Sequence, residues 1–171
     1  VHEMLGAGLR THYVASWHAA RLMAHAGRGL IVNIGSSAAL YPHFGPAYSM
    51  AKAALDVFTT TAARELREYG VAMVSVWPGP LVATERVREM GPEHVAQATE
   101  TPFFTGRAVR ALADDPDVLR MSGRVLAVAD LARHYGFTDA DGTVPPYPFD
   151  DEQMRRIATL RLPARPKRST P

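Results

Sequence analysis

The sequence predicts an α/β protein, a parallel sheet flanked by helices, and two kinds of segment support this fold class. Two short and almost continuous apolar runs, "LIVNIG" at 30–35 and "VAMVSVW" at 71–77, are typical of strands buried on both faces of a parallel sheet. Two long segments, 3–25 and 47–69, carry apolar residues at the spacing of amphipathic helices. Strand, helix and strand in close succession indicate a βαβ unit.

Both long helices have recognisable ends. Apolar residues in 3–25 recur three and four positions apart, and Gly27 follows the segment. Pro46 marks the start of the second helix, 47–69, because proline is favoured at the first helical position. Gly70 suits its C-terminal cap.

The chain beyond the second strand is less regular. We expect a short helix near 84–90, a longer helix at 105–116, and a last strand at 124–129 that runs into a helical turn. In the irregular stretch 81–104, the residues Met90, Phe103 and Phe104 suggest an apolar lining for a substrate.

Length and composition predict one domain. A chain of 171 residues, 47% hydrophobic, is long enough for one core and short for two. We expect residues 1–150 to belong to this domain. Residues 151–171 should form an extension or tail, because Pro, Asp and Arg are dense near the C-terminus. A short helix near 152–160 is expected within this extension.

Charge and residue usage exclude several classes of protein. A net charge of +2 with both signs interspersed gives no footprint for nucleic acid. No apolar run is long enough for a membrane span, no signal peptide is visible, and seven histidines without common spacing argue against a metal site. The absence of cysteine suits a reducing cytoplasm, where we expect the protein to reside.

Polar groups gather where the predicted strands end. Ser36 and Ser37 leave the first strand, and "PGPLVAT" leaves the second. In an open α/β sheet, ligands bind beyond these carboxyl ends. Tyr48 and Lys52 lie four residues apart on the intervening helix, so both can point into the same crevice.

The pattern predicts proton transfer to or from a carbonyl or alcohol. A tyrosine hydroxyl ionises near pH 10, so acid–base catalysis by tyrosine at neutral pH needs a neighbouring positive charge that favours the phenolate. Lys52 would supply this charge beside Tyr48. Ser36 can donate a hydrogen bond to the same substrate oxygen. Only two of the nineteen basic residues are lysines, Lys52 and Lys167, which favours a specific role for Lys52. The hydride for carbonyl reduction must come from a cofactor.

Three other interpretations stay open. Tyr48 could be a packed aromatic and Lys52 a solvated charge. Ser36 and His43 invite a hydrolase interpretation, although the G-x-S-x-G turn of such enzymes is missing. The chain could also be a catalytically inactive fragment or a scaffold that associates through its long helices. Asn33 fits a hydrogen-bonding core residue better than a catalyst.

The motifs "IVNIGSS", "YSMAK" and "PGPLVAT", at their joint spacing, resemble the C-terminal part of a short-chain dehydrogenase/reductase. The resemblance runs from about Leu5 to Gly142, and "GLIVNIGSSAAL", "WPGPLVATE" and "GRVLAVADLARHYGFTDADG" resemble one subgroup of this family. It implies a Rossmann-like sheet and NAD(P)(H)-dependent interconversion of a carbonyl and an alcohol. The residues do not distinguish NAD from NADP.

The resemblance assigns three catalytic residues. The family's catalytic serine matches Ser36, three residues after Asn33, with Ser37 as the neighbour that could be confused with it. Its catalytic tyrosine and lysine match Tyr48 and Lys52. The serine and the tyrosine are one residue closer here than is usual in the family.

The resemblance also assigns the nicotinamide end of a cofactor site. Tyr48 and Lys52 would lie against the cofactor, with Lys52 holding the nicotinamide ribose. Pro78 and Gly79 match the segment that passes the nicotinamide, and Thr84 matches the threonine that binds the carboxamide, one residue later than usual.

Two departures from the family pattern stand out. Gly8 occupies the position of an asparagine that supports a water-linked proton relay in the family. The chain opens at Val1 inside the helix that carries this position, and neither the family's glycine-rich turn nor its Asn-Asn-Ala-Gly segment is present. We therefore expect the C-terminal portion of a longer reductase, which lacks the N-terminal βαβ half and leaves strand 30–35 with an exposed edge.

The long helices predict self-association. In the family the helices that match 3–25 and 47–69 commonly form the oligomer interface, so we expect a homo-oligomer that binds a small carbonyl or alcohol substrate. The apolar residues of the first helix then serve for packing, partly at a subunit contact; they include Met4, Tyr13, Trp17 and Met23.

Overall fold

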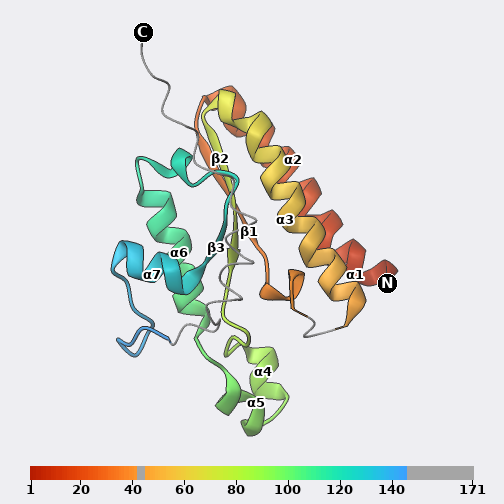
Figure 1. Ribbon diagram of the computed structural model, residues 1–171, viewed down its shortest axis with the longest axis vertical. Helices are drawn as coiled ribbons and strands as arrows, with labels where there is room; N and C mark the ends of the chain where they lie inside the picture. The colour runs from red at the N-terminus through yellow and green to blue at the C-terminus, as the bar shows by residue number, and fades with distance from the viewer. Residues whose placement is uncertain (42–44, 146–171) are drawn as a thin grey trace.

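The computed structural model describes residues 1–41 and 45–145, and a parallel sheet lies at its centre. The strands β1 (Gly29–Ile34), β2 (Val71–Trp77) and β3 (Val125–Ala127) pair in the order β1-β2-β3, all parallel (Figure 1). All seven residues of β2 are buried. The predicted α/β class and the parallel sheet are confirmed.

One face of the sheet is covered by the two long helices (Figure 1). The first consists of α1 (His2–Leu5), the π-helical turn η1 (Gly6–Arg10) and α2 (Thr11–Ala26). The second is α3 (Pro46–Leu66), extended by the 3₁₀ turn η3 (Arg67–Tyr69). Both helices were expected; the π turn was not.

In the π turn, a backbone N–H donates to a carbonyl five residues back, whereas in an α-helix the carbonyl is four residues back. The backbone N–H of Thr11 donates to the Gly6 carbonyl, five residues back. The Ala7 carbonyl, which an α-helix would pair with that N–H, instead accepts from the Thr11 hydroxyl at 2.5 Å. The side chain therefore satisfies the backbone group that the π turn releases.

A glycine is required where the second helix turns into β2. Gly70 has a φ of +70°, and a Cβ atom there would lie 2.3 Å from the Gly27 carbonyl oxygen. The two helix-to-strand turns therefore pack directly on each other at the end of the sheet where β1 and β2 begin.

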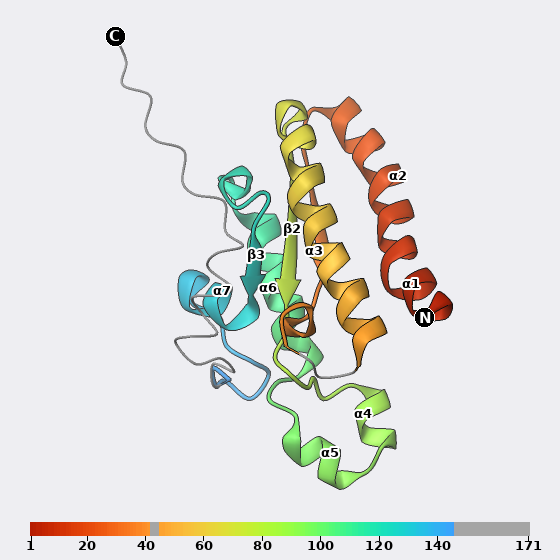
Figure 2. The ribbon, with the colours of Figure 1, turned by 45° about the vertical axis from the view of Figure 1, so that its right-hand side comes forward.

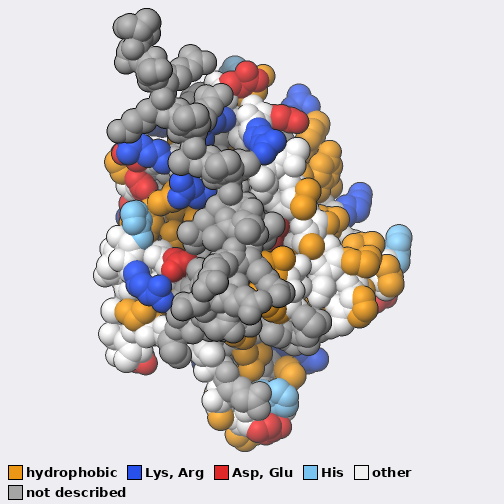
Figure 3. All heavy atoms as spheres, viewed as in Figure 1, with side chains coloured by type: hydrophobic (Ala, Val, Ile, Leu, Met, Phe, Trp, Pro, Cys, Tyr) orange, Lys and Arg blue, Asp and Glu red, His pale blue; other side chains and the backbone are white. Residues whose placement is uncertain are grey.

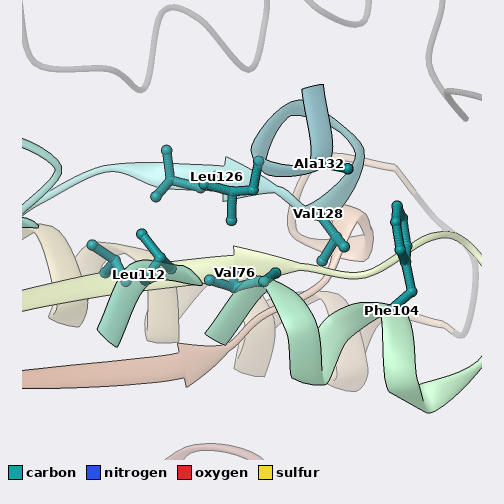
Figure 4. Close-up of a cluster of buried hydrophobic side chains, with 9 residues drawn as sticks. Val76, Phe104, Leu112, Leu126, Val128 and Ala132 are labelled. Carbon is teal, nitrogen blue, oxygen red and sulfur yellow. The ribbon is translucent and has the colours of Figure 1, made fainter. Parts of the chain in front are cut away.

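The opposite face of the sheet is covered by α6 (Pro102–Asp114) and α7 (Val128–Tyr135), which enclose the larger apolar core (Figure 4). Its buried members come from β2, β3 and both helices: Val74, Val76, Phe104, Ala108, Leu112, Leu126, Val128, Leu131 and Ala132. Phe104 is fully buried here, so the expectation that it lines a substrate site is wrong. Phe103 and Met90, the other two residues of this expectation, are exposed.

A smaller core lies between the sheet and the two long helices. Ile31 of β1 packs there with Val71, Met73 and Ala63, and Phe58 of α3 covers them. Apolar side chains thus alternate along β1 between the two faces, with Leu30, Val32 and Ile34 turned toward the larger core.

Short elements lie beyond the ends of the strands. The predicted helix near 84–90 is α4 (Glu85–Glu89), and a further short helix, α5 (Pro92–Gln97), was not expected (Figure 2). Two 3₁₀ turns, η2 (Ser37–Ala39) and η4 (Val118–Arg120), follow β1 and α6.

Several predicted boundaries differ from the structure by a few residues, most clearly those of α6 and β3. α6 begins at Pro102 rather than at Thr105, because proline occupies its first position. β3 ends at Ala127, since Val128 and the following residues turn into α7. The predicted helix at 152–160 and the tail at 151–171 lie outside the described residues.

Adjacent phenylalanines of α6 provide a matched test of the larger core. Phe104 is 0% exposed and Phe103 is 68% exposed. We expect Phe104→Ala to lower the free energy of unfolding by about 3–5 kcal/mol, through lost burial and the cavity it leaves. Phe103→Ala should change it by no more than about 0.5 kcal/mol. Urea unfolding followed by circular dichroism measures both, and equal losses would contradict the assignment of Phe104 to the core.

Candidate active site

The residues predicted to act together lie at the carboxyl ends of β1 and β2, beside the first turns of α3. α4 and α5 lie at this same end of the sheet (Figures 1 and 2). This is the edge where a parallel α/β sheet presents its ligand site.

Lys52 is held against the end of β1. Its Nζ donates a hydrogen bond to the Ile34 carbonyl at 3.0 Å, and it lies 5.6 Å from the centre of the Tyr48 ring. Burial lowers the pKa of Lys52, while the nearby Asp56 carboxylate acts in the opposite direction. The lysine and the tyrosine therefore meet, and the ammonium is anchored two residues before Ser36.

Ser36 and Ser37 differ in accessibility. Ser36 has extended backbone with φ −165°, and its Oγ accepts a hydrogen bond from the Ala38 N–H at 3.2 Å, which caps η2. Ser36 is half-buried, whereas Ser37 is only 2% exposed. Of the two, Ser36 is the one whose hydroxyl a substrate could reach.

The Pro78–Gly79 turn is supported by a buried carboxylate that the sequence did not reveal. Glu100 accepts hydrogen bonds from the Gly79 N–H and from the Thr105 hydroxyl, the latter at 3.2 Å. Burial raises the pKa of Glu100 despite these two hydrogen bonds. A Cβ atom at Gly79 would lie 2.4 Å from Thr99 Oγ1, so this turn packs closely against the segment that precedes α6.

Thr84 lies at the start of α4. Its Oγ1 accepts a hydrogen bond from the Val87 N–H at 3.3 Å, which is the usual role of an N-cap threonine. The hydroxyl proton of Thr84 is still available as a donor.

Asp56 is a second buried carboxyl that sequence reasoning missed. Its Oδ1 accepts from Ser75 Oγ at 2.5 Å, and its two oxygens lie 3.1 and 3.2 Å from Trp77 Nε1. Burial raises the pKa of Asp56 to about 6, although the bonds from Ser75 and Trp77 and the charge of Lys52 each lower it. The available signal was the spacing of four residues from Lys52, which puts both side chains on one face of α3.

His12 of α2 also belongs to the surroundings of Lys52. Burial, followed by the charge of Lys52, lowers the pKa of His12. Its Nδ1 is sealed from solvent and has no hydrogen-bond partner in the described part of the chain.

Asn33 is a hydrogen-bonding core residue, as expected. Its Nδ2 donates to Thr59 Oγ1 at 2.9 Å, and its Oδ1 lies 3.5 Å from Ser16 Oγ. The amide therefore joins α2, β1 and α3 rather than facing a ligand.

The described residues limit other kinds of site. Within 1–41 and 45–145, no group of three or more His, Cys, Asp or Glu side chains is placed to hold a metal ion. No helix within the same ranges is long and apolar enough to cross a membrane. His43, the partner of Ser36 in the hydrolase interpretation, lies outside them.

Comparison with known proteins identifies the family. Residues 2–94 match the family described as short chain dehydrogenase. The chain belongs to this family. The match spans the first helix, β1, α3 and β2, and therefore includes Ser36, Tyr48 and Lys52.

Curated relatives agree with the short-chain dehydrogenase assignment. Dehydrogenase/reductase SDR family member 1 from human and from mouse is 45% identical over 148 residues, which cover 79% of this chain and 47% of the relative. A 3-oxoacyl-[acyl-carrier-protein] reductase from Synechocystis is 33% identical over 114 residues, 63% of this chain and 46% of the relative. The chain thus spans about half the length of these relatives. The subgroup resemblance is confirmed.

Solved structures share the fold of this short-chain dehydrogenase chain. A putative NAD(P) dependent gluconate 5-dehydrogenase from Beutenbergia cavernae, with NADP bound at low occupancy, superposes with a TM-score of 0.62 at 27% identity, over 72% of this chain and 53% of that one. Acetoin dehydrogenase YohF from Salmonella typhimurium gives a TM-score of 0.61 at 25% identity, over 74% and 52%. The Rossmann-like interpretation is confirmed.

The buried carboxyl of Asp56 predicts a distinctive pH dependence of stability. Its pKa of about 6 lies above that of an unfolded aspartate, so the folded protein retains a proton that the unfolded chain releases. The stability contributed by Asp56 is therefore present below about pH 4 and lost as the pH rises through 6. We expect the unfolding free energy of the wild type, relative to Asp56→Asn, to fall by up to about 3 kcal/mol between pH 4 and 7.

Chemical denaturation at several pH values measures this difference. Asp141→Asn is the control, because hydrogen bonds from Thr143 lower the pKa of Asp141, so its contribution to stability is lost mainly below the tested pH range and should not fall between pH 4 and 7. If the difference in unfolding free energy between the wild type and Asp56→Asn stays constant from pH 4 to 7, Asp56 does not titrate in this range.

Proposed function

We propose that this chain carries the proton-transfer end of an NAD(P)(H)-dependent oxidoreductase that interconverts a carbonyl and an alcohol. The observation that carries the proposal is the placement of Lys52, whose ammonium is anchored to the end of β1 and lies beside the Tyr48 ring. A cation fixed next to a phenol at the ligand-binding edge of the sheet equips that phenol as an acid.

The proposed reaction uses three side chains. In the reductive direction, the Tyr48 hydroxyl gives its proton to the substrate oxygen, and Lys52 stabilises the phenolate that remains. The Ser36 hydroxyl donates a hydrogen bond to the same oxygen, where negative charge develops. Oxidation of the alcohol runs through the same steps in reverse.

A nicotinamide cofactor supplies the hydride when it is bound. The donors present fit its nicotinamide end. The Lys52 ammonium has three N–H donors, and the Ile34 carbonyl engages one of them, so the ammonium can also hold ribose hydroxyls together with Tyr48. Thr84 keeps a hydroxyl donor for the carboxamide, and Pro78 and Gly79 form the adjoining turn. The residues do not favour NAD over NADP.

Relatives support the oxidoreductase assignment at the level of reaction class. Their names describe dehydrogenases and reductases that act on different compounds, including 3-oxoacyl-[acyl-carrier-protein] and sorbitol-6-phosphate. We assign a small carbonyl or alcohol as the substrate and leave its identity to experiment.

A homo-oligomer formed through the two long helices accompanies this function. Apolar side chains collect on the side of the molecule where α1, α2 and α3 lie (Figures 1 and 3). Trp17 and Tyr13 of α2 and Val57 of α3 are exposed there. A groove of about 510 Å³ runs between the helices, lined mostly by apolar residues that include Leu9 and Phe58. A second copy of this chain would cover these surfaces.

Substitution of the proposed acid tests the enzymatic function. We expect Tyr48→Phe to lower the turnover of NAD(P)H-dependent carbonyl reduction by about 10²-fold or more, because the phenol proton is lost. Tyr69→Phe, at the far end of the same helix, should retain activity. The measurement is the loss of NAD(P)H absorbance with a panel of ketones and aldehydes, on protein expressed from the complete gene.

Other outcomes of this assay have definite meanings. Equal activity of Tyr48→Phe and the wild type would contradict the catalytic assignment. No cofactor oxidation by the wild type with any carbonyl would favour the alternative of a catalytically inactive fragment or scaffold that associates through its helices. Ester hydrolysis without nicotinamide, lost in Ser36→Ala, would instead support a hydrolase.

A charge placed on the apolar helix face tests self-association. Trp17 and Met90 are both 47% exposed, but Met90 lies beyond the strand ends at the C-terminus of α4. We expect Trp17→Glu to weaken the oligomer at least about tenfold, because the interface would bury an unpaired carboxylate. Met90→Glu should leave it unchanged. Sedimentation equilibrium measures both, and an unaltered association constant for Trp17→Glu would rule out this surface.

A further inference from the structure

Glu100 is a buried acid beside the proposed nicotinamide end of the site, and neither the sequence nor the relatives assign it a role. It lies in the short segment between α5 and α6 and is 6% exposed. A glutamate is rarely buried to this extent unless its oxygens have hydrogen-bond donors. The donors around Glu100 show which part of the chain it holds in place.

The Glu100 carboxyl joins two elements that are distant in sequence. It accepts a hydrogen bond from the Gly79 N–H, and its Oε1 accepts from the Thr105 hydroxyl of α6 at 3.2 Å. Its other oxygen, Oε2, lies directly behind Gly79, since a Cβ built on that glycine would be 2.9 Å from it. The lack of a side chain at Gly79 allows this close approach, which links the turn after β2 to the start of α6.

Backbone pairing extends this contact along the chain that follows the turn. The Thr99 N–H donates to the Leu81 carbonyl at 2.9 Å. The Ala83 N–H donates to the Glu100 carbonyl at 2.8 Å, and the resulting β-bridge is parallel. The stretch 79–84 is therefore held from one side by the two residues that precede Thr101.

The segment that carries Glu100 is itself firmly anchored. Asp139 accepts hydrogen bonds from the Thr101 N–H at 2.7 Å and from the Thr101 hydroxyl at 2.5 Å. α6 begins at Pro102, directly after this anchor, and its Phe104 side chain is fully buried in the larger core. The fixed start of α6 can therefore determine where the turn after β2 lies.

The acid is kept in this position at a cost to stability. Burial raises the pKa of Glu100 and the charge of Asp139 adds to this effect, whereas the hydrogen bonds from Gly79 and Thr105 oppose it. An ionisable group that is perturbed by burial beside a ligand site is a candidate for a functional role. The geometry of its contacts indicates which role this is.

The turn held by Glu100 is the one that would lie against the nicotinamide. In the proposed function, Pro78 and Gly79 form this turn, and Thr84 offers its hydroxyl to the carboxamide. A ligand binds more tightly when the groups that line its site already have the bound geometry, because no ordering cost is then added on binding. A turn without this anchor would bind the cofactor only in the fraction of molecules that have the right conformation.

We propose that Glu100 is a positioning residue for the nicotinamide cofactor. Its carboxyl holds the Gly79 N–H and, together with the pairing of residues 99–100, keeps the stretch 79–84 in the conformation that receives the nicotinamide. The inference rests on the proposed carbonyl reductase function. In this role Glu100 acts through the backbone of the turn and contacts neither the cofactor nor the substrate.

Amide hydrogen exchange measured by NMR tests this role without cofactor or substrate. Glu100→Met keeps a side chain of similar volume but removes the carboxyl oxygens, so we expect the Gly79 amide to exchange at least about tenfold faster. Glu100→Gln keeps an acceptor oxygen and should exchange at the wild-type rate. An equal rate at Gly79 in Glu100→Met and the wild type would overturn the proposal.

A second amide serves as the internal control. The Gly123 N–H donates to the Met73 carbonyl at 2.8 Å, away from the turn that follows β2. Its exchange should be the same in all three proteins, because only a general loss of stability would accelerate it. Equal acceleration at Gly79 and Gly123 would show that Glu100 supports the fold as a whole and does not position the turn.

Cofactor binding by protein expressed from the complete gene tests the consequence. We expect Glu100→Met to raise the Kd for NADH or NADPH, whichever the wild type binds more tightly, by at least about tenfold. Glu100→Gln should stay within about twofold of the wild type. The loss should appear in the KM for the cofactor and much less in kcat at saturating cofactor. Fluorescence of the bound dinucleotide measures the Kd.

A milder variant keeps the test valid if Glu100→Met does not fold. Thr105→Val removes the hydrogen bond that orients the Glu100 carboxyl but leaves the acid in place. It should shift the Gly79 exchange rate and the cofactor Kd in the same directions by smaller factors. Circular dichroism melts verify folding, and unchanged values in a folded Thr105→Val protein would then overturn the proposal.

The outcomes separate this proposal from the proposed function. If Tyr48→Phe is inactive while Glu100→Met binds the cofactor as tightly as the wild type, the reductase function stands and the positioning role is wrong. If Glu100→Met lowers kcat and leaves the Kd unchanged, Glu100 does not act through the cofactor. If the wild type binds no nicotinamide cofactor, both proposals fail, whatever the exchange rates show.

Discussion

The contact between α3 and β2 through Asp56 is the interaction on which the rest of the site depends. A carboxyl group buried under a helix must find donors, and Ser75 and Trp77 supply them from the strand. The same helix carries Tyr48 and Lys52 on its earlier turns, so fixing Asp56 on β2 also fixes where those two residues lie. The cost of burying the carboxyl is visible in its raised pKa.

This anchor acts together with contacts to β1. Lys52 reaches the last residue of that strand, and Asn33 reaches Thr59 further along α3. The helix is therefore held to two adjacent strands by polar groups, while apolar side chains fill the space between them. Polar contacts restrict which register of helix and sheet is acceptable, because any shift would leave buried groups without partners.

Much of this arrangement could be predicted from sequence, because apolar periodicity and strand-end residues are local signals. The runs at 30–35 and 71–77 and the spacing of Tyr48 and Lys52 were sufficient to place the strands, α3 and the site at one edge of the sheet. Phe104 was misplaced because the start of α6 was set three residues late, which put this residue in an irregular segment instead of on a buried helix face. The Pro92 that begins α5 was an available signal that was not used.

The buried carboxyls could not be predicted in the same way. An aspartate or glutamate on an amphipathic helix or in a loop usually faces water. The spacing of Asp56 from Lys52 places the two side chains on one face of α3 but does not reveal that the carboxyl is buried, and Glu100 has no such local signal. Their roles depend on partners far along the chain, such as Trp77 for Asp56 and the Gly79 N–H for Glu100. His12 is a similar case, since the charge that acts on it comes from Lys52 of α3.

The π turn in the first helix has a consequence for how this segment can vary. A π turn holds more residues than an α turn, so the segment 6–10 takes up one extra residue while α1 and α2 keep nearly the relative rotation of a continuous helix. Removing one residue there would restore a regular α turn with little change in this rotation, and Gly8 would keep its close approach to Ala51 of α3. A deletion within 6–10 should therefore be accepted more readily than a deletion in the regular turns of α2, which would rotate the rest of the helix by roughly 100°.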